Sequence, residues 1–169
     1  MTPPLLPSEI LRRVVRVSMF DGYSVLLVAG ACALASATSR EVFASVIGLL
    51  VAGAGAMEIH GAGLLRAGER RAMRWLFWSH LQIGASMMVY VAVRLSNPEI
   101  ESLRRVVTPE LAAQIEEAGL SVDQFLLGMM RIVYFSLVAA TVLYQGGMTF
   151  YYLRRRAAVE AALAGDDPP

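Results

Sequence analysis

The amino-acid sequence predicts an all-α integral membrane protein, a four-transmembrane-helix bundle with a small helical extracytoplasmic cap between the third and fourth spans. Three observations predict this class. The 169-residue chain is 56% hydrophobic and 17% charged, whereas soluble domains are about 45–50% apolar and about 25% charged. Its apolar residues form four long runs, and a spanning helix needs roughly 20 such residues. The strict alternation of a transmembrane β-strand is missing from these runs.

Composition limits the remaining possibilities. The chain is short enough for one domain, so residues 1–169 are interpreted as a single membrane domain. Its one cysteine, Cys32, excludes an internal disulfide and a multi-cysteine metal site, and we expect an inert buried thiol. The net charge of +1 gives no reason to expect a nucleic-acid partner. Phosphate-loop, zinc-protease and serine-hydrolase motifs are missing, so the sequence does not favour an enzyme.

The first two spans are predicted at residues 17–37 and 42–65. The first resembles a signal peptide, because arginines precede it and small residues follow it. Asp21 interrupts its apolar run, which favours a retained span. The short turn at residues 38–41 makes the two helices antiparallel neighbours.

The third and fourth spans are predicted at residues 75–93 and 129–153, and the helical outer loop between them at residues 97–124. Within this loop we expect one helix capped by Asn97 and a second that begins at Thr108-Pro109. Gly119 is expected to end the second helix in a left-handed conformation. The sequence Ser121-Val122-Asp123-Gln124 is typical of a capping box that opens the fourth long helix.

Arginines predict the orientation. Ten flank one side of the predicted spans and five the other. Because positive residues concentrate in the cytoplasm, we expect a bacterial-type inner membrane with both termini cytoplasmic. Trp75, Trp78, Tyr151 and Tyr152 match an aromatic belt on that side. The arginines expected to meet lipid headgroups are Arg66, Arg70, Arg71, Arg74, Arg154, Arg155 and Arg156.

Small residues recur every four positions on the first two spans, at Ala29, Ala33 and Ala37 and at Ala44, Gly48, Ala52 and Ala56. Such stripes let helices approach closely, either within one chain or between copies. Four thin spans enclose little interior of their own, so the sequence favours a homo-oligomer. The pair Gly146-Gly147 indicates a kink or a close helix crossing.

Polar side chains concentrate at one depth, estimated at roughly 7–14 Å from the inner arginines. This intramembrane layer comprises Asp21, Glu58, His60, His80, Gln82 and Gln145. Polar residues inside spans are functional candidates because they are costly there. Glu58 and His60 point to nearly opposite faces of one helix, so one of them must face away from the bundle, and no metal site is predicted.

Two polar stripes follow the third and fourth spans. Their members that are candidates for lining a pathway are Ser79, Ser86, Tyr90, Tyr134, Thr141 and Tyr152. The stripes fit either hydrogen bonding between adjacent helices or the lining of a hydrated path. The first alternative is the more common in membrane proteins.

The leading functional hypothesis is a channel- or transport-like assembly in which the titratable residues of the layer relay protons or hold ions. A structural or accessory membrane subunit is the second hypothesis. The third is a bis-histidine haem protein with His60 and His80 as axial ligands, although no cofactor is predicted outright. No catalytic residue is predicted under any of the three.

Overall fold

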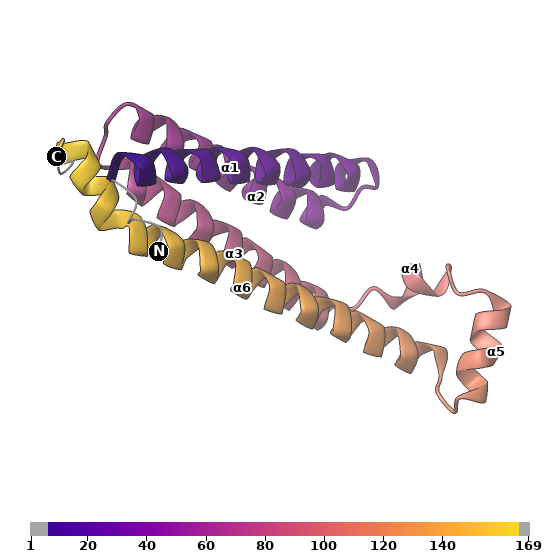
Figure 1. Cartoon of the computed structure of the whole chain (residues 1–169). Helices are drawn as coiled ribbons and strands as arrows, with labels where there is room; N and C mark the ends of the chain where they lie inside the picture. Colours follow the sequence, from indigo (N-terminus) through magenta and orange to yellow (C-terminus); the bar gives the residue numbers. More distant parts are fainter. Residues whose placement is uncertain (1–6, 166–169) are drawn as a thin grey trace. The chain divides into compact units, whose positions relative to one another are not determined.

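The computed structural model describes residues 7–165, and every regular element in that part of the chain is an α-helix (Figure 1). This confirms the all-α prediction. The helices are α1 (Pro7–Thr38), α2 (Val42–Arg66), α3 (Ala72–Ser96), α4 (Ile100–Arg104), α5 (Pro109–Glu117) and α6 (Val122–Ala164). Four of them, α1, α2, α3 and α6, are long and apolar enough to cross a membrane. The fold therefore fits a multi-pass membrane protein.

The long helices agree with the predicted spans in number but extend beyond most of them. The bounds of α2 differ from the prediction by one residue, whereas α1 begins ten residues earlier and α6 is 43 residues long. Apolar runs mark only the part of a helix that avoids water. The flanking segments carry arginine, alanine and glutamate, which form helices well without being apolar.

The chain divides into two compact units, which we describe separately. The described part of the first comprises residues 7–86 and 142–165, and the second is Met87–Thr141. The first unit contains α1, α2, most of α3 and the last half of α6. The second contains the end of α3, the two short helices and the first half of α6.

Helices α1 and α2 pack along each other in the first unit (Figure 1). Gly22 and Gly55 form the closest crossing: a Cβ atom added to Gly55 would lie 2.7 Å from the backbone nitrogen of Leu26. Gly48 also packs closely on Ala33, whose Cβ would lie 2.9 Å from a Cβ added to Gly48. Part of the small-residue pattern is therefore used within the chain. Gly146 and Gly147 differ, since nothing lies within 4 Å of an added Cβ at either position, so close packing inside the chain does not explain that pair.

An apolar core joins the start of α1, the end of α2, the start of α3 and the end of α6. Its fully buried members are Val14, Leu65, Ala72, Leu76 and Val159, and Tyr152 contributes its ring. Burying these side chains together holds the four helices in contact at this end of the first unit. Cys32 lies outside the core and is exposed, so the expectation of a buried thiol was wrong.

In the second unit, Thr108 caps α5, and its hydroxyl accepts a hydrogen bond from the Leu111 amide. Gly119 adopts the expected left-handed conformation with φ of 78°. The capping box also forms, because Ser121 and Gln124 exchange hydrogen bonds of 3.2 and 3.3 Å. These three predictions of local structure are confirmed.

Asn97 does not cap the first short helix, as the sequence had suggested. Its backbone amide instead donates to the Val93 carbonyl at 2.9 Å, which prolongs the hydrogen-bond ladder of α3. Helix α4 begins at Ile100, with Glu99 in the capping position and no side-chain cap. The Glu99 carboxylate accepts from Arg94 at 2.8 Å.

Candidate functional site

Three titratable side chains from three helices meet in the first unit. Asp21 comes from α1, Glu58 from α2 and His80 from α3, and their exposed fractions are 6%, 0% and 1%. We call these three residues the acid–histidine cluster. One potential ligand atom from each lies within 4.8 Å of the other two. Convergence of three buried ionisable groups is the most specific chemical feature of this part of the molecule.

The glycine crossing explains why two carboxylates come so close. Gly22 follows Asp21 directly, and Gly55 precedes Glu58 by less than one helical turn. With no Cβ on either glycine, the backbones of α1 and α2 approach far enough for the carboxylates to reach one space. His80 enters that space from α3, above the core residue Leu76 one turn earlier.

Distances within the cluster are short. His80 Nε2 lies 3.3 Å from Glu58 Oε1 and 3.8 Å from Asp21 Oδ2. Neither contact has hydrogen-bond geometry, and Nε2, Asp21 Oδ2 and Glu58 Oε2 are buried without a hydrogen-bond partner. Among the described residues, no arginine lies within 4.0 Å of either carboxylate. Even a protonated imidazole would therefore leave two ionised carboxylates with a net charge of −1.

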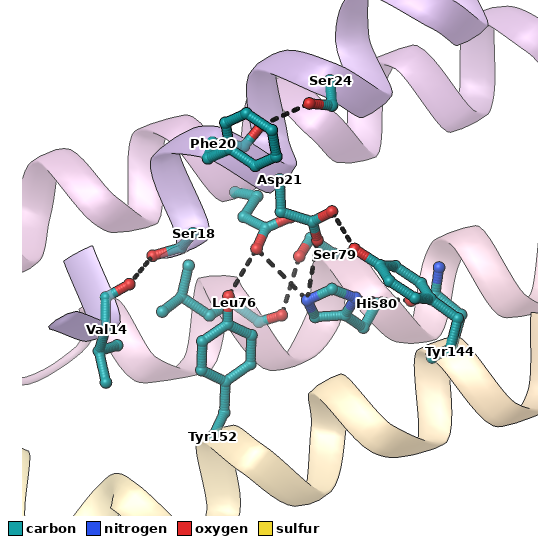
Figure 2. A network of polar contacts seen from close by, with 12 residues as sticks. Val14, Ser18, Phe20, Asp21, Ser24, Leu76, Ser79, His80, Tyr144 and Tyr152 are labelled. Carbon is teal, nitrogen blue, oxygen red and sulfur yellow. Dashed lines mark hydrogen bonds and ion pairs between the residues drawn. The ribbon is translucent and has the colours of Figure 1, made fainter. Parts of the chain in front are cut away.

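Helix α6 supplies the polar groups that surround the cluster. Figure 2 shows Tyr144 and Tyr152 approaching Asp21 and His80 from this helix. The Tyr144 hydroxyl donates to Asp21 Oδ1, and the Tyr152 hydroxyl donates to Glu58 Oε1 at 2.7 Å. Gln145 Oε1 lies 2.5 Å from His80 Nδ1. Each ionisable group is thus oriented by one side chain of α6.

The structure brings together only part of the predicted polar layer. Asp21, Glu58, His80 and Gln145 meet, whereas His60 and Gln82 lie outside. His60 is exposed, with its ring 5.0 Å from that of Trp75. Gln82 donates to the Leu50 carbonyl at 3.0 Å. Glu58 and His60 therefore face opposite ways, as their spacing indicated, and the two histidines have different surroundings.

The two polar stripes do not act as continuous units. Ser79 is buried, but its hydroxyl donates to the Leu76 carbonyl of its own helix at 2.8 Å. Ser86 is buried in the first unit and Thr141 half-buried in the second. Tyr90 and Tyr134 form an edge-to-face pair in the second unit, with ring centroids 6.1 Å apart. This aromatic pair links the two stripes there.

The prediction that Tyr152 lies in a surface belt was wrong, and Tyr144 was missing from the predicted site. Tyr152 is 2% exposed and binds Glu58, so it does not belong to a surface belt. Tyr144 was not a candidate site residue. Its spacing of eight from Tyr152 places both on one helical face, and that spacing was the available signal. Ser18, three residues before Asp21, was also missed; it is fully buried, and its hydroxyl bonds to the Val14 carbonyl.

Arginines form a second feature of the first unit. A pocket of about 470 Å³ is lined by Arg70, Arg71, Arg74 and Arg156, together with Trp78 and Phe77. Arg71 and Arg156 pair with acidic neighbours, whereas Arg70 and Arg74 have no ion-pair partner among the described residues. Arg66 lines a separate pocket with Arg12 and Arg16. Arg154 is exposed, and Arg155 stacks on Tyr151 at 6.0 Å.

Comparison of the chain with protein-family models, with curated proteins and with solved structures finds no match. The chemistry must therefore be argued from the cluster itself. Two carboxylates and one imidazole can take up a proton or a cation, and the tyrosines can donate hydrogen bonds to them. Asp21, Glu58 and His80 are the described residues that could hold a metal ion together.

Proposed function

We propose that this chain is a multi-pass membrane protein with a channel- or transport-like role, in which the acid–histidine cluster binds the cation that is moved. The observation that carries the proposal is the burial of Asp21, Glu58 and His80 within 4.8 Å of one another on three apolar helices. Ionisable groups inside a membrane are costly and usually mark ion or proton pathways.

Exposed apolar side chains support the membrane environment. Phe20, Leu27 and Leu143 are 76%, 69% and 76% exposed. Only 6% of the most apolar window of α6 is buried within the fold. Water would penalise such surfaces, whereas lipid chains would cover them at no comparable cost.

Charge balance supports the uptake of a cation. With both carboxylates ionised, the cluster carries a charge of −2 or −1, depending on the imidazole. No arginine in the described part of the chain forms an ion pair with it. An apolar environment penalises net charge strongly, so the neutral state requires an additional proton or metal ion. A cluster that takes up a cation and releases it again would be suited to moving that cation across the membrane.

A flux assay in proteoliposomes tests the role. Purified protein is reconstituted with a trapped pH dye or with trapped calcein, which Co²⁺ quenches. We expect proton or Co²⁺ entry above that of protein-free vesicles, abolished by His80→Ala and by Glu58→Gln. His60→Ala is the matched control, because His60 lies outside the cluster, and it should retain flux. Absence of flux in the unmodified protein, or equal loss in all three variants, contradicts the proposal.

The arginine distribution supports an inner-membrane topology with both termini in the cytoplasm. Loop residues 67–71 and the end of α6 would then lie inside, and helices α4 and α5 would form an extracytoplasmic cap. Helix α6, at about 65 Å, exceeds the roughly 30 Å hydrocarbon core, so its arginine-rich end would project inward. Single cysteines at Ala67 and Ala113, in a Cys32→Ser background, test this, because both positions are exposed. Only the Ala113 cysteine should react with an impermeant maleimide in intact cells.

Two surfaces of the first unit favour two kinds of partner, an anionic lipid and a second copy of the chain. The pocket beside Arg70, Arg74 and Trp78 has the charge and the apolar wall to take an anionic lipid headgroup. The open face at Gly146 and Gly147 leaves room for a helix of another copy. Native mass spectrometry from mild detergent should detect a homo-oligomer with retained anionic lipid. A bare monomer at every lipid concentration contradicts both expectations.

A further inference from the structure

We infer that the acid–histidine cluster is a mononuclear site for a divalent first-row transition metal, with Asp21, Glu58 and His80 as its protein ligands. The inference builds on the proposed function only in taking the cluster as the place where a cation binds. It names the class of cation and assigns a role to each surrounding side chain.

The spacing of the ligand atoms fits such an ion. Metal–ligand bonds of about 2.0–2.1 Å place tetrahedral ligand atoms about 3.3 Å apart. The corresponding octahedral separations are about 3.0 Å for neighbouring ligands and about 4.2 Å for opposite ones. Nε2 of His80 lies 3.3 and 3.8 Å from the nearest oxygens of Glu58 and Asp21. The ligand atoms of all three side chains lie within 4.8 Å of one another, so a metal ion can be bound once the two carboxylates close slightly towards each other.

The unpaired atoms of the cluster point to a missing central partner. Asp21 Oδ2, Glu58 Oε2 and His80 Nε2 are all buried without a hydrogen-bond partner. Each belongs to a side chain that is more than nine-tenths buried. Buried polar atoms normally find a partner. Nε2 and Asp21 Oδ2 lie 3.8 Å apart, and the Glu58 carboxylate approaches Nε2 to 3.3 Å through its other oxygen, Oε1, so a cation held between the three side chains would be a simple shared partner.

The hydrogen bond at Nδ1 fixes the orientation and tautomer of His80. Because Gln145 Oε1 is an acceptor, the 2.5 Å contact requires the proton on Nδ1. The Nε2 lone pair of the neutral ring then faces two carboxylates, an arrangement that is repulsive without a cation between them. Metal-binding histidines characteristically donate their other ring N–H to an oxygen acceptor in this way.

The tyrosines prepare the carboxylates for binding. Tyr144 holds Asp21 Oδ1 and Tyr152 holds Glu58 Oε1, so Asp21 Oδ2 and Glu58 Oε2 have no hydrogen-bond partner. Outer hydrogen bonds of this kind orient carboxylate ligands. Tyr144, Gln145 and Tyr152 are therefore positioning residues, all supplied by α6.

Ligand chemistry and charge select the class of ion. One imidazole nitrogen with two carboxylates suits Mn²⁺, Fe²⁺, Co²⁺ or Zn²⁺ better than Mg²⁺ or Ca²⁺, which prefer oxygen ligands alone. Copper(I) prefers sulfur, and Cys32 is exposed outside the cluster. A divalent ion with two carboxylates and a neutral imidazole has zero net charge. A proton on Nε2 would supply only one positive charge and leave the cluster at −1 with both carboxylates ionised.

Binding of Co²⁺ tests the inference. The full-length protein is purified in mild detergent, stripped with chelator and titrated with Co²⁺, and visible absorption and bound metal are measured after desalting. We expect one Co²⁺ per chain. His80→Ala and Glu58→Gln should weaken binding at least 100-fold, Tyr152→Phe should weaken it about 10–100-fold, and His60→Ala should bind normally. Size-exclusion profiles and helical circular dichroism establish that each variant is folded.

Three results would overturn the metal site. These are no stoichiometric Co²⁺ on the unmodified protein, undiminished binding by folded His80→Ala, or equal loss in folded His60→Ala. The first does not depend on whether any variant folds. Because metal binding is measured in detergent, its outcome does not depend on whether the protein transports ions in vesicles. Co²⁺ binding without flux would remove the transport role alone, and proton flux without Co²⁺ binding would remove the metal site alone.

Discussion

The glycine crossing between α1 and α2 allows a sharp test of how packing builds the site. In Gly55→Ala, the new Cβ would lie 2.7 Å from the Leu26 nitrogen and 2.8 Å from the Gly22 oxygen. Ordinary contacts begin near 3.4 Å, so the backbones must separate by about 0.6–0.7 Å. Overpacking of this kind costs about 1–3 kcal/mol. Both close contacts are backbone atoms, which cannot rotate away.

Gly53→Ala on the same helix is the matched control. Nothing lies within 4 Å of a Cβ at Gly53, and alanine is more favourable than glycine in a helix interior by about 0.5–1 kcal/mol. Thermal unfolding in one detergent, followed by near-ultraviolet circular dichroism, should therefore give midpoints displaced in opposite directions. A Gly55→Ala midpoint at or above that of Gly53→Ala would refute the close crossing. Its Co²⁺ affinity should also fall, because Asp21 and Glu58 lie beside this contact.

Three further predictions concern single side chains. Tyr152→Phe should destabilise the fold by about 1–3 kcal/mol, since it leaves the Glu58 oxygen unpaired. The control is Tyr151→Phe, which removes a buried hydroxyl without a hydrogen-bond partner and should not lower the thermal midpoint. Equal midpoints for the two variants would contradict this prediction. Thr108→Ala should remove the cap of α5 at a cost of about 1 kcal/mol, seen as faster hydrogen exchange in that helix alone. Hydrogen bonds from its own backbone amide and from Thr108 hold the pKa of Glu110 below its ordinary value. The ionised carboxylate therefore stabilises α5 at pH values above the ordinary pKa of glutamate, and this stabilisation should be lost as the pH falls through the lowered pKa. Hydrogen exchange in α5 should show this pH dependence in the unmodified protein and not in Glu110→Gln. The same pH dependence in both proteins would contradict the prediction.

Local structure was predictable to the extent that it depends on near neighbours. Thr108, Gly119 and the Ser121–Gln124 pair act within one helical turn, so the sequence contains all the atoms involved. Asn97 shows the limit of this reasoning. Its side chain is a good cap, but its amide could also continue α3, and the pattern alone does not rank these two outcomes.

Most residues of the site were recognisable because polar groups stand out in apolar runs. Asp21, Glu58, His80 and Gln145 were candidates from composition and depth alone. Tyr144 was not among the candidate site residues, since a tyrosine in an apolar run is compatible with ordinary packing. Tyr152 was predicted both in the aromatic belt and among the pathway-lining candidates, and its burial against Glu58 excludes the belt.

The sequence by itself determined that the chain forms four long apolar helices, because hydrophobic run length and helical periodicity are properties of each segment. It also separated Glu58 from His60, because about 100° per residue fixes their relative faces. Tertiary structure alone decided which faces meet. The rotation and offset of one helix against another depend on contacts such as Gly22 with Gly55. Those contacts placed Asp21, Glu58 and His80 in one buried space and left His60 outside it.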